Sequence, residues 1–165
     1  MRLHTSLPLT KANAIITESL RLGRAAGLLP LTVVVLDAGG KMVAMQCEDG
    51  SGLIRFEVAF GKAYGALGMG ISSRLIRDRL RDRPTFQSAL ATAADGRLIP
   101  VPGGVLVEDA KGVTLGAVGV SGDTSDKDEY CAIEAIKQAG YSPEPAAPNP
   151  DWRTSSLSDH YPAST

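Results

Sequence analysis

The chain has 165 residues, of which 44% are hydrophobic, 21% charged and 5% aromatic, and its formal net charge is −1. This size and composition predict one domain over residues 1–140, followed by a proline-rich tail over residues 141–165. The near-neutral charge argues against nucleic acid or an anionic membrane as a partner, and no apolar run approaches the ~20 residues needed to span a bilayer.

Cysteine content and the N-terminal segment indicate the compartment. Cys47 and Cys131 are too few for a disulfide scaffold and lack the spacing of a zinc site, so we expect both to be buried thiols. Residues 1–8 lack the apolar stretch of a secretory signal. These features predict a cytoplasmic protein.

The first part of the chain predicts a helix and an antiparallel hairpin. Thr10 is a candidate N-cap for a helix that ends before Pro30. Residues 31–36 are largely β-branched and predict a central strand that is buried on both faces. The turn at residues 38–41 is too short for a parallel crossover, so a second strand at residues 42–47 pairs antiparallel with the first.

The remaining elements follow in chain order. Helices are expected at about residues 53–67 (capped by 49–52), through Leu80 with Ser73 as the cap, from Pro84, and at 126–140, with strands at 98–99, 105–107 and 113–120. The hairpins rule out a doubly wound parallel sheet. The predicted fold class is therefore α/β in the α+β sense, with a central antiparallel sheet of about five strands and helices on both faces.

The tail carries five prolines and cannot form a helix or a central strand. It also carries Trp152, the single tryptophan of the chain, and Tyr161. Either the tail is loose, or these rings dock it on its own domain or on a neighbouring subunit. We expect docking, because an aromatic side chain buries enough area to fix a segment.

Two glycine-rich strand ends, at residues 102–105 and 116–123, are candidates for close backbone contact. Glycine leaves the backbone open to a ligand, a helix N-terminus or another subunit, and its amides can bind an anion. Neither segment matches a P-loop or a dinucleotide fingerprint. The candidate ligand-binding residues at these ends are Gly103, Gly104, Ser121 and Gly122.

Arg55 and Lys62 lie along one stripe of the helix predicted at residues 53–67, about two turns apart. The neighbours of Lys62 on that surface are small and apolar. Lys62 is either an exposed lysine whose stem covers apolar surface, or an anchor for an anion or a carboxylate in a cleft.

The last predicted helix begins with an acidic cluster that contains Asp123, Asp126, Asp128 and Glu129. In one interpretation, these side chains have no role beyond stabilising the positive end of the helix. Alternatively, one of the carboxylates pairs with Lys62 or Arg55 across a pocket. The spacing does not match a calcium loop, and we predict no metal site.

The two histidines, His4 and His160, lie near the two ends of the chain. This position argues against a catalytic histidine and against a histidine-ligated haem in the core, although either histidine could act in trans if the ends dock on another subunit. The candidate catalytic residues are therefore Lys62, Asp126 and Asp128, because a buried carboxylate with a raised pKa can act as a general base without histidine.

The chain resembles the GlcG/HbpS-like family of haem-degrading or haem-binding domains, which also form the C-terminal domain of some PduO-type corrinoid adenosyltransferases. The resemblance spans about residues 9–140. It rests on the order and spacing of motifs at residues 35–40, 48–50, 62–63, 102–104 and 116–122, followed by 126–128.

This resemblance implies a profilin-like three-layer α/β/α sandwich that assembles into homodimers or higher oligomers. It also implies a small pocket near Lys62 and the glycine-rich ends, at a subunit interface, with haem or a corrinoid as candidate ligands. The family motif Gln-Asp is Lys127–Asp128 here, so only Asp128 carries over. The first predicted helix lacks the histidine that ligates haem in the PduO-type domain.

Three functions are consistent with these residues, one of which is a purely structural role as an assembly partner. The first is an oligomeric binding protein with a pocket for an anionic metabolite or a tetrapyrrole. The alternative is a small hydrolase or isomerase that acts on a carboxylated catabolic intermediate, with Lys62 or Arg55 as the substrate anchor and Asp126 or Asp128 as the general base.

Overall fold

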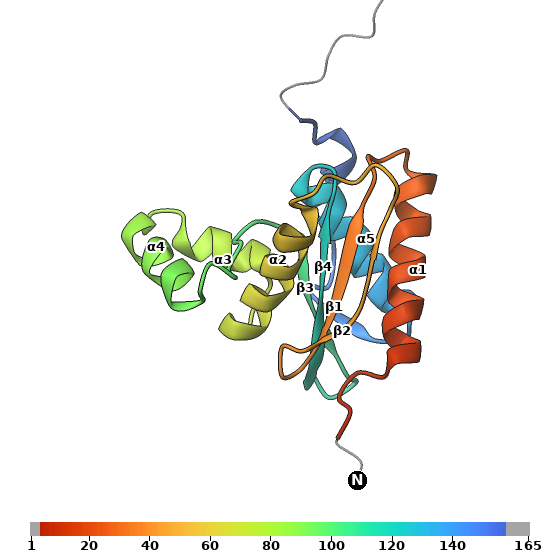
Figure 1. The fold of residues 1–165 in the computed structure, drawn as a ribbon, viewed down its shortest axis with the longest axis horizontal. Helices are drawn as coiled ribbons and strands as arrows, with labels where there is room; N and C mark the ends of the chain where they lie inside the picture. Colours follow the sequence, from red (N-terminus) through yellow and green to blue (C-terminus); the bar gives the residue numbers. More distant parts are fainter. Residues whose placement is uncertain (1–3, 158–165) are drawn as a thin grey trace, which may run out of the picture.

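The computed structural model describes residues 4–157 (Figure 1). Its elements in chain order are α1 (Leu9–Ala25), β1 (Thr32–Asp37), β2 (Met42–Cys47), α2 (Arg55–Met69), α3 (Ser73–Leu80), α4 (Pro84–Ala93), β3 (Gly104–Glu108), β4 (Thr114–Ser121), α5 (Ser125–Gln138), β5 (Ser142–Glu144) and a 3-10 turn at Trp152–Thr154. The strands form one antiparallel sheet in the order β2-β1-β4-β3-β5.

The sheet lies between two helical layers, as Figure 1 shows. Helices α1 and α5 cover one face, and α2 covers the other, with α3 and α4 extending away from the sheet on the α2 side. The predicted α+β class, with an antiparallel sheet of five strands and helices on both faces, is confirmed.

Strand β1 shows why two helical layers form. Val33 and Val35 pack into the core under α1 and α5, whereas Val34 and Leu36 pack under α2. Because successive side chains of a strand point to opposite faces, a run of apolar residues must be covered from both sides. The prediction of a strand buried on both faces is therefore confirmed.

Three helix starts differ from the prediction. Thr10 is not the N-cap of α1, because the extended Pro8 takes that place and its carbonyl accepts the first backbone hydrogen bonds. Helix α2 begins at Arg55, after a turn at residues 52–54, and residues 49–52 provide no side-chain cap. The N-cap of α3 is Ser72 rather than Ser73, whose hydroxyl bonds to Gly104 instead.

The predicted strand at residues 98–99 is wrong. The Ile99 amide donates to the Gly61 carbonyl of α2, so this segment covers a helix and does not join the sheet. Glycine at position 61 leaves room for that approach, since a Cβ there would lie 2.5 Å from the Ile99 side chain. The fifth strand is β5 in the tail, which pairs with β3 at the sheet edge, where proline is tolerated.

The tail also docks through an aromatic contact. The Trp152 ring is buried and stacks on Tyr130 of α5, with ring centroids 3.7 Å apart. The prediction that Trp152 fixes the tail is confirmed, with its own domain as the docking surface. Tyr161 lies outside the described residues. The expectation for the cysteines is right for buried Cys131 but wrong for Cys47, which is exposed because β2 is an edge strand.

A pair of glycines brings the backbone of α2 against the sheet. Gly104 of β3 and Gly119 of β4 face each other across the two strands. A Cβ on Gly104 would collide with the Lys62 carbonyl, and a Cβ on Gly119 would collide with the Ala59 carbonyl. The close approach expected at the glycine-rich ends is thus made by α2 at these two positions.

We predict that Gly119→Ala lowers the free energy of unfolding by about 3 kcal/mol, because α2 must move away from the sheet. The control is Gly68→Ala on the same helix, where an added Cβ meets nothing within 4 Å. That change should raise the free energy of unfolding by about 0.5–1 kcal/mol through helix propensity. Urea unfolding followed by circular dichroism measures both; equal midpoints for Gly119→Ala and the parent would contradict the packing described.

Candidate functional site

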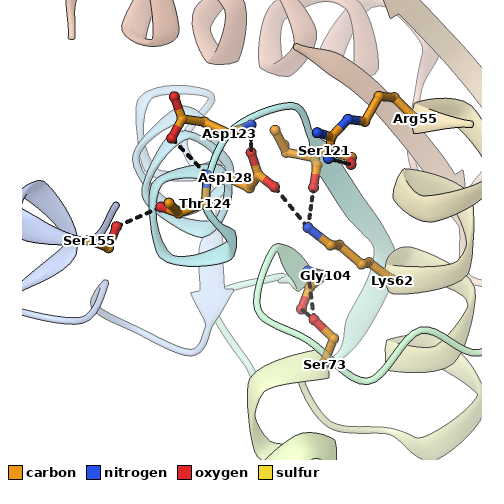
Figure 2. Close-up of polar contacts among 10 residues, drawn as sticks. Arg55, Lys62, Ser73, Gly104, Ser121, Asp123, Thr124, Asp128 and Ser155 are labelled. Carbon is orange, nitrogen blue, oxygen red and sulfur yellow. Dashed lines mark hydrogen bonds and ion pairs between the residues drawn. The ribbon is translucent and has the colours of Figure 1, made fainter. Parts of the chain in front are cut away.

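A buried ion pair joins the two helical layers past the end of the sheet. Lys62 of α2 extends to Asp128 of α5, with Nζ 2.9 Å from Oδ2 (Figure 2). Both residues are 1% exposed. The same Nζ donates to the carbonyl of Val120, at the end of β4, at 2.9 Å. The predicted pairing of a helix-start carboxylate with Lys62 therefore occurs, and it leaves Lys62 buried.

The surroundings of the pair are made by backbone. The second oxygen of Asp128 accepts the Asp123 amide at 3.1 Å. Gly103 has a φ of 115° and lies so close that a Cβ would be 2.9 Å from the Lys62 Nζ. Burial raises the pKa of Asp128, while Lys62, the Asp123 amide and Arg55 act in the opposite direction. The pair is thus held by groups that leave little room for a further partner.

The other predicted ligand-binding residues lie around this pair. Arg55 is partly buried and donates to the Ser121 hydroxyl at 3.3 Å, which places its guanidinium at the outer side of the cluster. The Gly104 amide is already used, because it donates to the Ser73 hydroxyl at 2.7 Å. Gly122 packs against the carbonyl of Pro30.

Asp126 is half-buried near the start of α5, whereas the ion pair to Lys62 is made by Asp128. The hypothesis that the residues of this cluster bind a ligand or catalyse a reaction stays a prediction.

Sequence reasoning did not assign a role here to Ser73, whose hydroxyl ties α3 to the start of β3 in Figure 2. Its only sequence signal was that of a helix cap.

A hollow at the opposite end of the sheet contains a different set of groups. Its volume is about 490 Å³. Its lining residues come from the segment before α1 and the β1–β2 hairpin: His4, Thr5, Leu7, Leu9, Asp37, Lys41, Met42 and Val43. The hollow therefore combines an imidazole, a thioether, an ammonium group, a carboxylate and a hydroxyl with apolar side chains. His4 is the one histidine within the described residues.

The chain is a small α+β protein in which an antiparallel sheet lies between two helical layers, and a buried lysine–aspartate pair joins these layers. The chain belongs to the HbpS-like family: the family model described as haem degrading protein HbpS-like matches residues 7–137. The resemblance found in the sequence is thereby confirmed.

Two solved structures and one relative in sequence are similar to this chain. The crystal structure of a PduOC:heme complex is similar with a TM-score of 0.74 and 20% identity, over 82% of this chain and 96% of that chain. A crystal structure of HbpS is similar with a TM-score of 0.70 and 25% identity, over 84% of this chain and 92% of that chain. An uncharacterized 15.0 kDa protein in the dhaT-dhaS intergenic region of Citrobacter freundii is 29% identical over 108 residues, 66% of this chain and 75% of that protein.

No helix within residues 4–157 is both long enough and apolar enough to cross a membrane.

We predict that Lys62→Met lowers the free energy of unfolding by about 3–5 kcal/mol, because Asp128 is left buried without its cation. The double variant Lys62→Met/Asp128→Leu should recover much of that loss, since no buried charge remains. Lys137→Met breaks an exposed pair with Glu134 and should change the stability little. Urea unfolding curves measure all three, and a fully stable Lys62→Met protein would show that the pair does not hold the layers together.

Proposed function

We propose that this protein is a homo-oligomeric small-ligand-binding protein that takes haem in the hollow around His4. The observation that carries the proposal is the set of groups lining this hollow. Its volume of about 490 Å³ falls in the range of small-molecule pockets. Membership of the HbpS-like family and the fold shared with the PduOC:heme complex support haem as the ligand class.

The chemistry of the lining residues fits a haem. The imidazole of His4 and the thioether of Met42 are both groups that ligate haem iron in proteins. Leu9 and Val43 offer apolar surface to a porphyrin ring, and the Lys41 ammonium, which lines the hollow together with the Asp37 carboxylate, offers a cation to a propionate. Bound haem would supply a redox-active iron.

The Lys62 cluster supports an enzymatic function less well. Asp128 is buried and already accepts hydrogen bonds from Lys62 and from the Asp123 amide. It would act as a general base on a carboxylated substrate only after this ion pair opens. Arg55 is the partly accessible cation of the cluster, and its guanidinium is the group that an anionic metabolite would meet first.

We predict that the full chain binds haemin with a Soret shift that saturates near one haem per chain. His4→Ala should weaken binding by about tenfold or more, because the axial imidazole is lost. The matched control is His160→Ala, which removes the other histidine and should bind as the parent does. Absorbance titration measures all three proteins.

Loss of the Soret shift in His160→Ala but not in His4→Ala would contradict the assignment of the hollow. Binding of a corrinoid but not of haemin would keep a tetrapyrrole ligand and reject haem. Decay of the Soret band under a reductant and oxygen would favour haem degradation over simple binding.

Exposed apolar side chains support the proposed self-association. Leu53, in the turn before α2, is 98% exposed and is followed by exposed Ile54. Helix α4 projects from the sheet, has no buried residue, and carries the exposed Phe86. Exposed apolar residues mark contacts between proteins when they are contiguous, as Leu53 and Ile54 are in the chain.

We predict that native mass spectrometry of the parent protein shows a multiple of the chain mass. Leu53→Glu should shift the population toward the monomer, because a carboxylate would be buried in the contact. Val113→Glu makes the same change at an exposed valine in the β3–β4 turn and should leave the oligomer intact. A parent protein that is monomeric at micromolar concentration would overturn the proposed assembly.

A further inference from the structure

Glu129 follows Asp128 on α5 but has very different surroundings. Its side chain is 0% exposed, and within residues 4–157 neither carboxyl oxygen has a hydrogen-bond partner. The Arg74 guanidinium of α3 approaches it, with Nε 3.4 Å from Oε1. Because buried carboxylates are normally hydrogen-bonded, this environment disfavours the ionised form.

Charges from three elements face this carboxyl group. Burial, together with Asp126 of α5 and Glu144 of β5, raises the pKa of Glu129 to about 7, while Arg74 and Arg77 of α3 act in the opposite direction. The net effect places the titration of Glu129 in the physiological range, well above the ordinary value of 4.5.

The tail is attached to the elements that surround Glu129. The Glu144 carboxylate accepts the Ser72 amide at the start of α3. The Ala147 carbonyl accepts Nη2 of Arg74 at 2.9 Å, so a single arginine contacts both the tail and Glu129.

The next part of the tail stays on the same helix. Trp152 stacks on Tyr130, the residue that follows Glu129. Ser155 then bonds to Thr124, the N-cap of α5, beside Asp123 and Asp128 (Figure 2). The tail thus runs from β5, past the buried carboxyl group, to the end of α5 that holds the Lys62 ion pair.

We propose that residues 142–155 form a pH-sensitive strap, which is docked when Glu129 carries a proton and loosens when Glu129 ionises. In the docked state Arg74 contacts the tail, and the Glu129 carboxyl group is buried without hydrogen bonds. Ionisation favours any arrangement that lets water reach Glu129. Release of the strap would in turn uncover the start of α5, where Asp128 lies.

The direction follows from proton linkage. Since the pKa of Glu129 is raised in the docked state, its contribution to docking is fully present below about pH 4.5 and is lost as the pH rises through about 7. The difference between these values limits the change in the docking equilibrium to about 300-fold.

Hydrogen exchange of the tail amides in the full chain, at about pH 5 and about pH 8, tests the proposal. After correction for intrinsic exchange rates, tail opening in the parent should increase by about 10- to 70-fold between these conditions, which lie inside the full range of the linkage. In Glu129→Gln, which keeps the shape but does not titrate, the corrected opening should be the same at both. Glu134→Gln removes a half-exposed carboxylate from the same helix and should behave as the parent.

Emission of Trp152, the single tryptophan, gives a second readout of the same event. A pH-dependent change with a midpoint near 7, absent in Glu129→Gln, supports the strap. If Glu129→Gln does not fold, Glu129→Leu replaces it, because leucine fills the buried position without a charge. The proposal is overturned if tail opening has the same pH dependence in the parent and in the folded Glu129 variant.

Discussion

The buried ion pair between Lys62 and Asp128 is the constraint on which the arrangement of the helices depends. A lysine side chain reaches from α2 to α5 only if the α2 backbone lies directly on the sheet. Gly104 and Gly119 permit this, since any side chain there would push the carbonyls of α2 away. Desolvating two charges costs free energy, which their mutual contact and the Val120 carbonyl offset. The buried ion pair therefore depends on the two strand glycines, because they let α2 approach the sheet closely enough for Lys62 to reach Asp128.

Local pattern was enough to predict most of the fold. The β-branched run of β1 and the short glycine turns determine strands and antiparallel pairing, because both act between near neighbours in the chain. The local pattern gave a wrong or missing element where a segment's conformation depends on a residue far away in the chain. The local pattern of residues 98–99 predicts a strand. In the structure these residues pack on α2 instead, because Gly61 has no side chain and its carbonyl accepts the Ile99 amide. Strand β5 contains a proline and is recognisable only once the edge of β3 is known to be free for pairing.

In the candidate site, too, the residue types were predictable from the sequence, whereas the contacts between distant segments were not. A lysine among small residues and an acidic helix start were both visible in the sequence, and so was their pairing as one alternative. The burial of Lys62 was not visible, because Gly103 and Val120 enclose it from elements some 40 to 60 positions away in the chain. His4 was discounted because it lies near a chain end. The hollow in which we propose a role for His4 is formed only when the segment before α1 meets the β1–β2 hairpin.

Asp128 and Glu129 show how far two consecutive carboxylates can differ. Asp128 meets an ammonium group and a backbone amide, so its burial serves to hold the layers together. Within residues 4–157, Glu129 pairs with a guanidinium that also contacts the tail, and neither of its carboxyl oxygens accepts a hydrogen bond. A leucine would fill the same space at less cost in desolvation, so packing alone does not account for a carboxyl group there. The pH-sensitive strap that we propose would account for it, because the carboxyl group and the tail are linked through Arg74.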